Sequence, residues 1–133
     1  MDGSVDLSFE SLTDIGNIPS TRGMGWLASE LKQEDWTVSL NSMAIEEIAS
    51  MVDQTRRNPL PTLLLKPEQF EIHELQSAYE KAKAICDRGA GFAVIDKLPI
   101  DDFEIEDMVN VYWILGHLMG RNVAQKWDGT MIY

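Results

Sequence analysis

The sequence predicts an α+β fold in which helices pack against a few short strands. Two stretches, residues 42–57 and 71–88, show the three- and four-residue apolar spacing of amphipathic helices. A third, residues 102–119, is apolar on more than one side, which is typical of a helix buried between two layers. Short apolar or alternating runs between these stretches have the length and residue types of strands.

Capping residues and charges mark the ends of the first two helices. Asn41 or Ser42 is expected to cap the first helix, because short polar side chains accept hydrogen bonds from the first turn. This helix carries Arg56 and Arg57 in its last turn, where the helix dipole favours cations. We therefore expect the basic pair to stabilise the end of the helix and not to form a phosphate-binding site. Gly89 is expected to end the second helix.

The third helix is expected to begin at Asp101 or Asp102 and to run to about Met119. Gly120 follows at the place of a left-handed C-cap glycine. Within this helix Gly116 costs roughly 1 kcal/mol of helix propensity. We therefore expect another backbone to pack closely there and further elements to cover the helix on both sides.

Strands are expected in the remaining apolar segments. Trp36–Leu40 alternates apolar and polar residues, as a half-buried strand does, and Phe92–Ile95 has the apolar run of a buried strand. Asn122–Lys126 and Thr130–Tyr133 flank Asp128-Gly129, which predicts a hairpin.

The chain is expected to divide into an arm and one domain. Residues 1–25 lack sustained periodicity and predict an irregular N-terminal arm, with a lid over a pocket as the less favoured alternative. Residues 26–133 form the domain, which begins with a short helical turn at Trp26–Leu31. Leu63–Leu65 is either a short strand or a tucked loop.

Composition limits the classes of partner and compartment. The net charge of −11 argues against nucleic acid or an anionic membrane surface as the main partner. No apolar run reaches the roughly 18 residues of a membrane span, and the acidic start of the chain does not have the basic region of a signal peptide. We therefore expect a cytoplasmic protein. Cys86, the single cysteine, excludes an internal disulfide and is expected to be a buried structural thiol.

The glycine pair Gly89 and Gly91 does not predict a phosphate-binding loop. A dinucleotide fingerprint needs its glycines after a strand and before a helix. Here the glycines follow a predicted helix and precede a predicted strand, so we reject that interpretation.

Three segments near the C-terminus combine into a recognisable order. They read Gly-Ala-Gly-Phe-Ala-Val-Ile-Asp-Lys-Leu-Pro at 89–99, Tyr-Trp-Ile-Leu-Gly-His-Leu-Met-Gly at 112–120 and Val-Ala-Gln-Lys-Trp-Asp-Gly at 123–129. This order resembles the N-terminal part of the taurine dioxygenase / clavaminate synthase-like family of Fe(II)- and 2-oxoglutarate-dependent oxygenases. The resemblance covers about residues 26–133. It implies the N-terminal helices and first strands of a double-stranded β-helix (jelly-roll) oxygenase fold, apparently incomplete in this chain.

The resemblance also implies an iron site that this sequence does not supply. Such oxygenases bind Fe(II) with a His-x-Asp/Glu motif and a distal histidine. Neither His73 nor His117 is followed by that motif, and no arginine matches the family's 2-oxoglutarate clamp. We assign no catalytic residue and no metal ligand here, and we expect His117 to be a hydrogen-bonded structural histidine. The chain is expected to be an N-terminal piece whose full-length protein binds Fe(II) and 2-oxoglutarate.

Substrate-binding candidates come from the same resemblance. Gln125 matches the family's Gln-x-x-x-Gly; it either faces the active-site mouth or satisfies backbone groups in a turn, and the turn is favoured. Trp127 and Tyr133 line the same mouth or pack against their neighbours. The implied reaction is oxidation of a C–H bond of a small organic substrate. The alternative is a non-catalytic α+β partner-binding module. Its partners would be a covering chain or a second copy of this chain.

Overall fold

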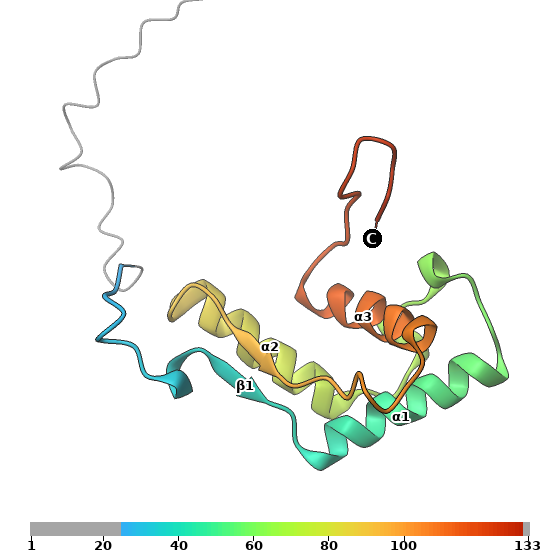
Figure 1. Ribbon diagram of the computed structural model, residues 1–133, viewed down its shortest axis with the longest axis horizontal. Coiled ribbons are helices and arrows are strands. Elements are labelled where there is room, and N and C mark those ends of the chain that lie inside the picture. Colours follow the sequence, from blue (N-terminus) through green and yellow to red (C-terminus); the bar gives the residue numbers. More distant parts are fainter. Residues whose placement is uncertain (1–24, 132–133) are drawn as a thin grey trace, which may run out of the picture.

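The protein has an α+β fold, as a computed structural model that describes residues 25–131 shows (Figure 1). Within these residues the helices are α1 (Ser42–Arg57), α2 (His73–Arg88) and α3 (Ile105–Met119). The strands are β1 (Thr37–Ser39) and β2 (Val94–Asp96). The predicted arm lies almost wholly outside the described residues, and Tyr133 lies outside them.

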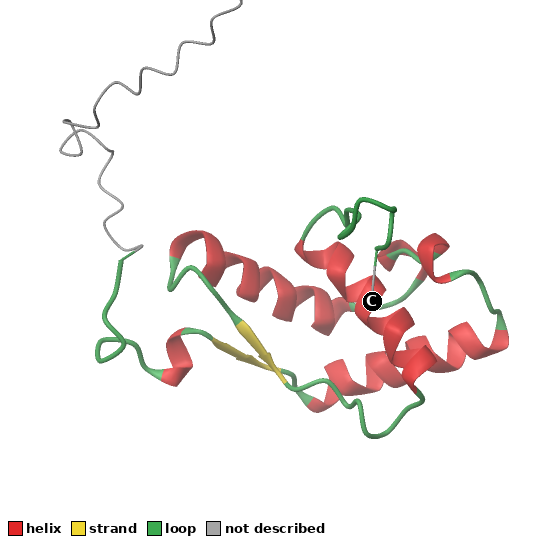
Figure 2. Cartoon of the chain, turned by 45° about the horizontal axis from the view of Figure 1, so that its top comes forward, coloured by secondary structure: helices red, strands yellow, loops and turns green. Residues whose placement is uncertain are grey.

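The two strands form a small parallel sheet that packs along α2 (Figure 2). Thr37 is in register with Val94, and the pair is extended at one end by the N–H of Leu40, which donates to the carbonyl of Asp96 at 3.0 Å. The strand predicted at 36–40 is therefore confirmed. The strand predicted at 92–95 is shifted and is not buried, since Val94 is 44% exposed. Its outer face has no cover among residues 25–131.

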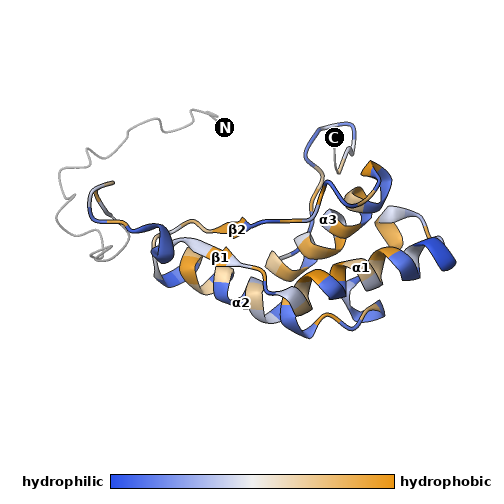
Figure 3. Ribbon diagram, turned by 60° about the horizontal axis from the view of Figure 1, so that its bottom comes forward, coloured by the Kyte–Doolittle hydropathy of each residue, from blue (hydrophilic) through white to orange (hydrophobic). Residues whose placement is uncertain are grey.

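The hydrophobic core lies between the three helices, because α3 packs against both α1 and α2 (Figure 3). Each helix turns its apolar side chains toward this centre, and each fully buried Leu or Ile contributes roughly 1.5–3 kcal/mol. The largest fully buried side chains of the helices are Ile48, Met51, Val52, Leu75, Val111, Ile114 and Leu115. The strand residue Ile95 and the following Leu98 pack against the edge of this cluster.

The helix starts show which capping signals act locally. Asn41 caps α1 as predicted, because its Oδ1 accepts from the N–H of Ala44 at 2.8 Å. The first turn of α2 is capped from another helix: the two carboxylate oxygens of Glu47 accept from the N–H groups of Glu74 and Leu75, each at 2.9 Å. α1 and α2 are therefore joined by a cap as well as by the core.

The prediction for the ends of α3 was wrong in detail. Asp102 does not cap this helix, since its own N–H closes a turn onto the carbonyl of Pro99 at 3.2 Å. The helix begins later, after Glu104. At the other end Gly120 has a φ of 167°, which is extended backbone and not the expected left-handed cap.

Polar contacts fix α3 against α1 and the turn between α1 and α2. Arg56 donates from Nε and Nη2 to the carboxylate of Asp107, whose side chain is 11% exposed. The indole N–H of Trp113 donates to the carbonyl of Leu65 at 3.1 Å. Leu65 follows a 3₁₀ turn, Thr62–Leu64, so the segment is a turn and not a strand; Leu65 is buried, whereas Leu63 and Leu64 are exposed.

α3 is covered on one broad face only. Ile105 is 79% exposed and Tyr112 is 61% exposed, so the expectation of cover on both sides fails within the described residues. None of the helices in residues 25–131 has the length and apolarity needed to cross a bilayer.

The C-terminal loop, residues 120–131, contains a turn but no strands in the part that is described. The N–H of Gln125 and that of Lys126 both point to the carbonyl of Thr130, at 2.7 and 3.3 Å. Gly129 has a φ of +89°, a conformation that glycine adopts without strain. The turn at Asp128-Gly129 is confirmed and the flanking ladder is not, because a hairpin with no third strand beside it is marginal.

Candidate functional site

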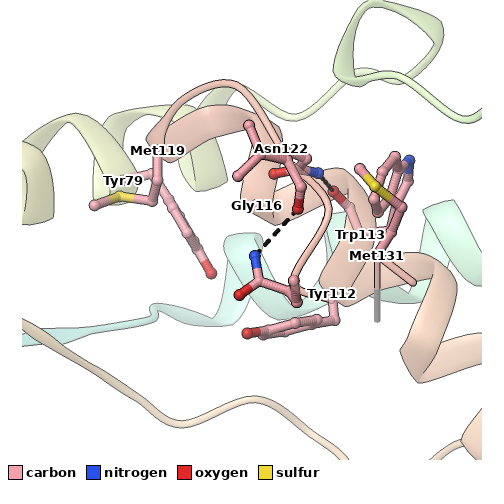
Figure 4. Close-up of a pocket in the computed structure, with 9 residues that line it drawn as sticks. Tyr79, Tyr112, Trp113, Gly116, Met119, Asn122 and Met131 are labelled. Atoms are coloured by element: carbon pink, nitrogen blue, oxygen red, sulfur yellow. Dashed lines mark hydrogen bonds between the residues drawn. The ribbon is translucent and has the colours of Figure 1, made fainter. Parts of the chain in front are cut away.

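A hollow lies between α2, α3 and the C-terminal loop (Figure 4). Its volume is about 500 Å³, which lies in the range of small-molecule sites. The residues that line it are Tyr79, Tyr112, Trp113, Gly116, Met119, Asn122, Val123, Gln125 and Met131. We call this hollow the α2–α3 pocket.

A hydrogen bond from Asn122 helps to hold the loop over α3, in addition to the packing of Met131 against the core. Asn122 donates from Nδ2 to the backbone carbonyl of Trp113 at 3.2 Å, a contact drawn as a dashed line in Figure 4. A Cβ placed on Gly116 would lie 3.0 Å from Oδ1 of the same asparagine. The close approach predicted at Gly116 therefore exists, but it is made by a loop side chain and not by another backbone.

Tyr79 brings a phenol from α2 into the pocket wall. The residue is only 8% exposed, and this burial raises the pKa of Tyr79 to about 12, with a smaller contribution from Tyr112. The phenol is therefore neutral over the physiological range, and its hydroxyl can both donate and accept a hydrogen bond. Within residues 25–131 it has neither partner.

The structure describes two of the three sequence-predicted site residues, Gln125 and Trp127, and only the first lies in the pocket wall. Gln125 lies in the wall of the α2–α3 pocket and also donates from Nε2 to the carbonyl of Val123 at 3.1 Å, as the turn alternative requires. Trp127 is 100% exposed and is not part of the pocket wall. Tyr133 lies outside the described residues. Their roles in substrate binding stay predictions.

Sequence reasoning missed most of the wall. Tyr79 belongs to the apolar stripe of α2, and Tyr112 and Trp113 belong to the apolar run of α3, so all three were assigned to packing. The sequence did offer one signal: Tyr79 and Tyr112 carry a polar hydroxyl group within otherwise apolar helix segments. Tertiary packing decides where the two helices separate and leave a pocket. The spacing of apolar residues along the sequence does not encode that packing.

The described residues do not fit an iron site. His73 is exposed in the first turn of α2, and His117 lies half-buried in α3 with its ring edge-on to Trp113, at 5.0 Å between centroids. No group of three or more His, Cys, Asp or Glu side chains in residues 25–131 is placed to hold a metal ion. The expected hydrogen bond of His117 is also missing, since its Nε2 is buried without a partner in this part of the chain.

The pocket is chemically suited to binding. Its wall combines aromatic rings, thioethers and amides, and none of its nine residues is charged. A general acid or base near neutral pH would have to come from another part of the protein. Cys86, the one thiol of the sequence, is half-buried in α2 and is not in the wall. No family model and no curated protein matches this chain.

Proposed function

We propose that this chain forms the N-terminal part of an Fe(II)- and 2-oxoglutarate-dependent oxygenase similar to the taurine dioxygenase / clavaminate synthase-like family. One observation carries the proposal: the three segments on which the resemblance rests all border the hydrophobic core or the pocket beside it. They contain the strand β2, the second half of α3 and two residues of the pocket wall, Val123 and Gln125. Asn122, which directly precedes the third segment, donates a hydrogen bond to Trp113 of the second, and Ile95 of the first packs against the shared core.

The incomplete sheet supports the same proposal. Val94 and Asp96 use their backbone groups toward β1, so the N–H and carbonyl of Ile95 point to the other side, where residues 25–131 provide no partner. A two-stranded sheet is marginal unless further strands extend it. The exposed apolar side chains Val94 and Ile105 give such strands a surface to bury. A double-stranded β-helix would supply both the further strands for the sheet and the layer that covers these side chains.

The proposal gives these residues a supporting role and no step at the metal. When bound, iron and 2-oxoglutarate supply the oxidation of a C–H bond of a small organic substrate. The histidines described above do not fit that iron, and the uncharged α2–α3 pocket contains no cationic partner for a dicarboxylate. The residues that bind both groups would belong to the remainder of the fold.

A second candidate, a non-catalytic binding module, is favoured by a different observation. The three helices close one core among themselves, with Ile48, Leu75 and Ile114 at 0% exposure. A core of this kind does not need a second layer in order to form. In that case the chain would bind its ligand or partner without performing chemistry on it.

The native protein decides between the two. It is captured from its source with an antibody raised against this chain, its intact mass is measured, and Fe(II)-dependent release of succinate from 2-oxoglutarate is assayed. The oxygenase proposal expects a mass well above that of 133 residues, together with succinate release. A native protein of 133 residues without succinate release would refute the proposal and favour the module.

The isolated chain serves as the control. Residues 1–133 alone are expected to release no succinate under the same conditions, because the described histidines do not converge. Turnover by the isolated chain would contradict the structural roles given to His73 and His117.

A further inference from the structure

We propose that the α2–α3 pocket is a binding site for an uncharged small molecule that carries an aromatic ring and a hydrogen-bonding group. The proposal concerns binding alone. It holds whether the chain belongs to an oxygenase or acts as a module, and it assigns no chemical step to the pocket.

The uncharged wall is the first observation. Charged residues make up 25% of the sequence, yet none of the nine lining residues is charged. An ionised group that enters the pocket loses part of its hydration and meets no partner of opposite charge in the wall. An anion meets a further penalty from the net charge of −11. The pocket therefore selects for neutral ligands.

The flat apolar surfaces of the wall are the second observation. Tyr79, Tyr112 and Trp113 supply three rings, and Met119 and Met131 supply adaptable thioethers. Figure 4 shows Tyr79 with Met119 on one side of Asn122 and Trp113 with Met131 on the other. Rings prefer offset or edge-on contacts with other rings, and thioether sulfur packs favourably against ring edges. An aromatic ligand would use both kinds of contact.

The third observation is that two polar groups of the wall have no hydrogen-bond partner within residues 25–131. The hydroxyl of Tyr79 has no hydrogen-bond partner within residues 25–131, and it is not one of the fully buried polar atoms of this part of the chain, so it is open to water or to a ligand. The amide oxygen of Gln125 also accepts no hydrogen bond there, since only its Nε2 is used. A ligand with one hydroxyl or amide group can accept from the first and donate to the second.

The binding test compares three probes that share one ring and differ in charge. Benzyl alcohol, benzoate and benzylammonium are titrated into the full native protein, and the indole N–H signal of Trp113 and the amide signals of Asn122 are followed by NMR. Benzyl alcohol is expected to shift these signals with saturation. Each ion is expected to bind at least about tenfold more weakly, a difference of about 1.4 kcal/mol. Equal binding of an ion, or no saturable shift with benzyl alcohol, would overturn the proposal.

Two variants locate the site and test its charge selectivity. Gln125→Glu places a carboxylate in the wall, and Gln33→Glu makes the same change at an exposed residue outside it, so both proteins have a net charge of −12, one unit below −11. Both positions are exposed, so both variants are expected to fold. Gln125→Glu should weaken benzyl alcohol binding and strengthen benzylammonium binding, each several-fold, whereas Gln33→Glu should change neither.

Identical behaviour of the two glutamate variants would refute the location of the site. The hydroxyl of Tyr79 is tested separately by Tyr79→Phe, which keeps the ring. This variant should weaken benzyl alcohol binding several-fold without changing the melting temperature by more than a few degrees. Unchanged affinity with an intact fold would remove Tyr79 from the site. Succinate release is measured in parallel, so that failure of binding and failure of the oxygenase proposal are separate results.

Discussion

Glu47 is expected to be the most important single polar residue for the packing of α2 against α1. Its carboxylate accepts two backbone N–H groups in the first turn of α2, those of Glu74 and Leu75, at 2.9 Å each. Ile72, at the N-cap position itself, offers no side-chain hydrogen bond. The change Glu47→Ala therefore leaves two donors of the helix terminus without the partner that they have within residues 25–131.

The magnitude follows from the number of bonds. Loss of one N-cap hydrogen bond costs typically about 1 kcal/mol. Two bonds to one half-buried carboxylate are therefore worth roughly 2 kcal/mol. For a chain of this length a loss of 1 kcal/mol lowers the melting temperature by roughly 4 °C, so Glu47→Ala should lower it by about 8 °C. Glu47→Gln keeps one good acceptor and should lose about half as much.

Thermal unfolding followed by circular dichroism measures the effect, and Glu46→Ala is the matched control. Glu46 is the preceding residue of α1, is exposed, and carries the same charge, so its replacement by alanine changes helix propensity and net charge equally. Its melting temperature should stay within about 2 °C of the wild type, as for other exposed substitutions. Equal melting temperatures for the two alanine variants would refute the role of Glu47 as a cap between helices.

Three further predictions concern α1, α3 and the pocket. Gly116→Ala should leave the melting temperature nearly unchanged, because a gain of about 1 kcal/mol in helix propensity offsets the hydrogen bond that the displaced Asn122 loses. Amide exchange of residues 121–131 should nevertheless become faster, and unchanged exchange would show that Asn122 does not anchor the loop. The stability that Tyr79 contributes should be complete below pH 10 and lost as the pH rises to about 12, because burial raises its pKa from 10.0 to about 12 and the tyrosine of the unfolded chain ionises first. The difference in unfolding free energy between wild type and Tyr79→Phe, followed across alkaline pH, measures this loss. A difference that does not change with pH would contradict the prediction. Arg56→Met should lower the melting temperature more than Arg57→Met, because Arg56 pairs with a buried carboxylate of α3 and Arg57 with an exposed one in its own helix; equal shifts would contradict this ranking.

The features that the sequence predicted well are those set by neighbouring residues. α1 begins after Asn41 and ends at Arg57 as expected, because its cap, its stripe and its closing charges all lie within the helix. The turn at Asp128-Gly129 was likewise readable from two residues. β1 falls inside the predicted strand, and the α+β class follows from these elements together.

The errors arise where distant residues decide. The start of α2 depends on Glu47, which is 27 residues away from the first N–H that it binds. The burial expected for Val94 requires a second layer that residues 25–131 do not contain. The wall of the α2–α3 pocket joins Tyr79 to Gln125 across two helices, and only Gln125 was singled out beforehand, through a resemblance and not through spacing.

The parallel pairing of β1 with β2 has a consequence for how the chain folds. Thr37 and its partner Val94 are 94 − 37 = 57 residues apart, and both α1 and α2 lie between them. A ribosome adding about 5–20 residues per second would separate their synthesis by roughly 3–11 s. During that interval β2 cannot yet cover the side chain of Val38, which is buried in the folded protein. The helix α2 packs on β1 and is synthesised before β2, so it can cover Val38 first. The helices are therefore expected to form the folding nucleus, and the sheet to close late.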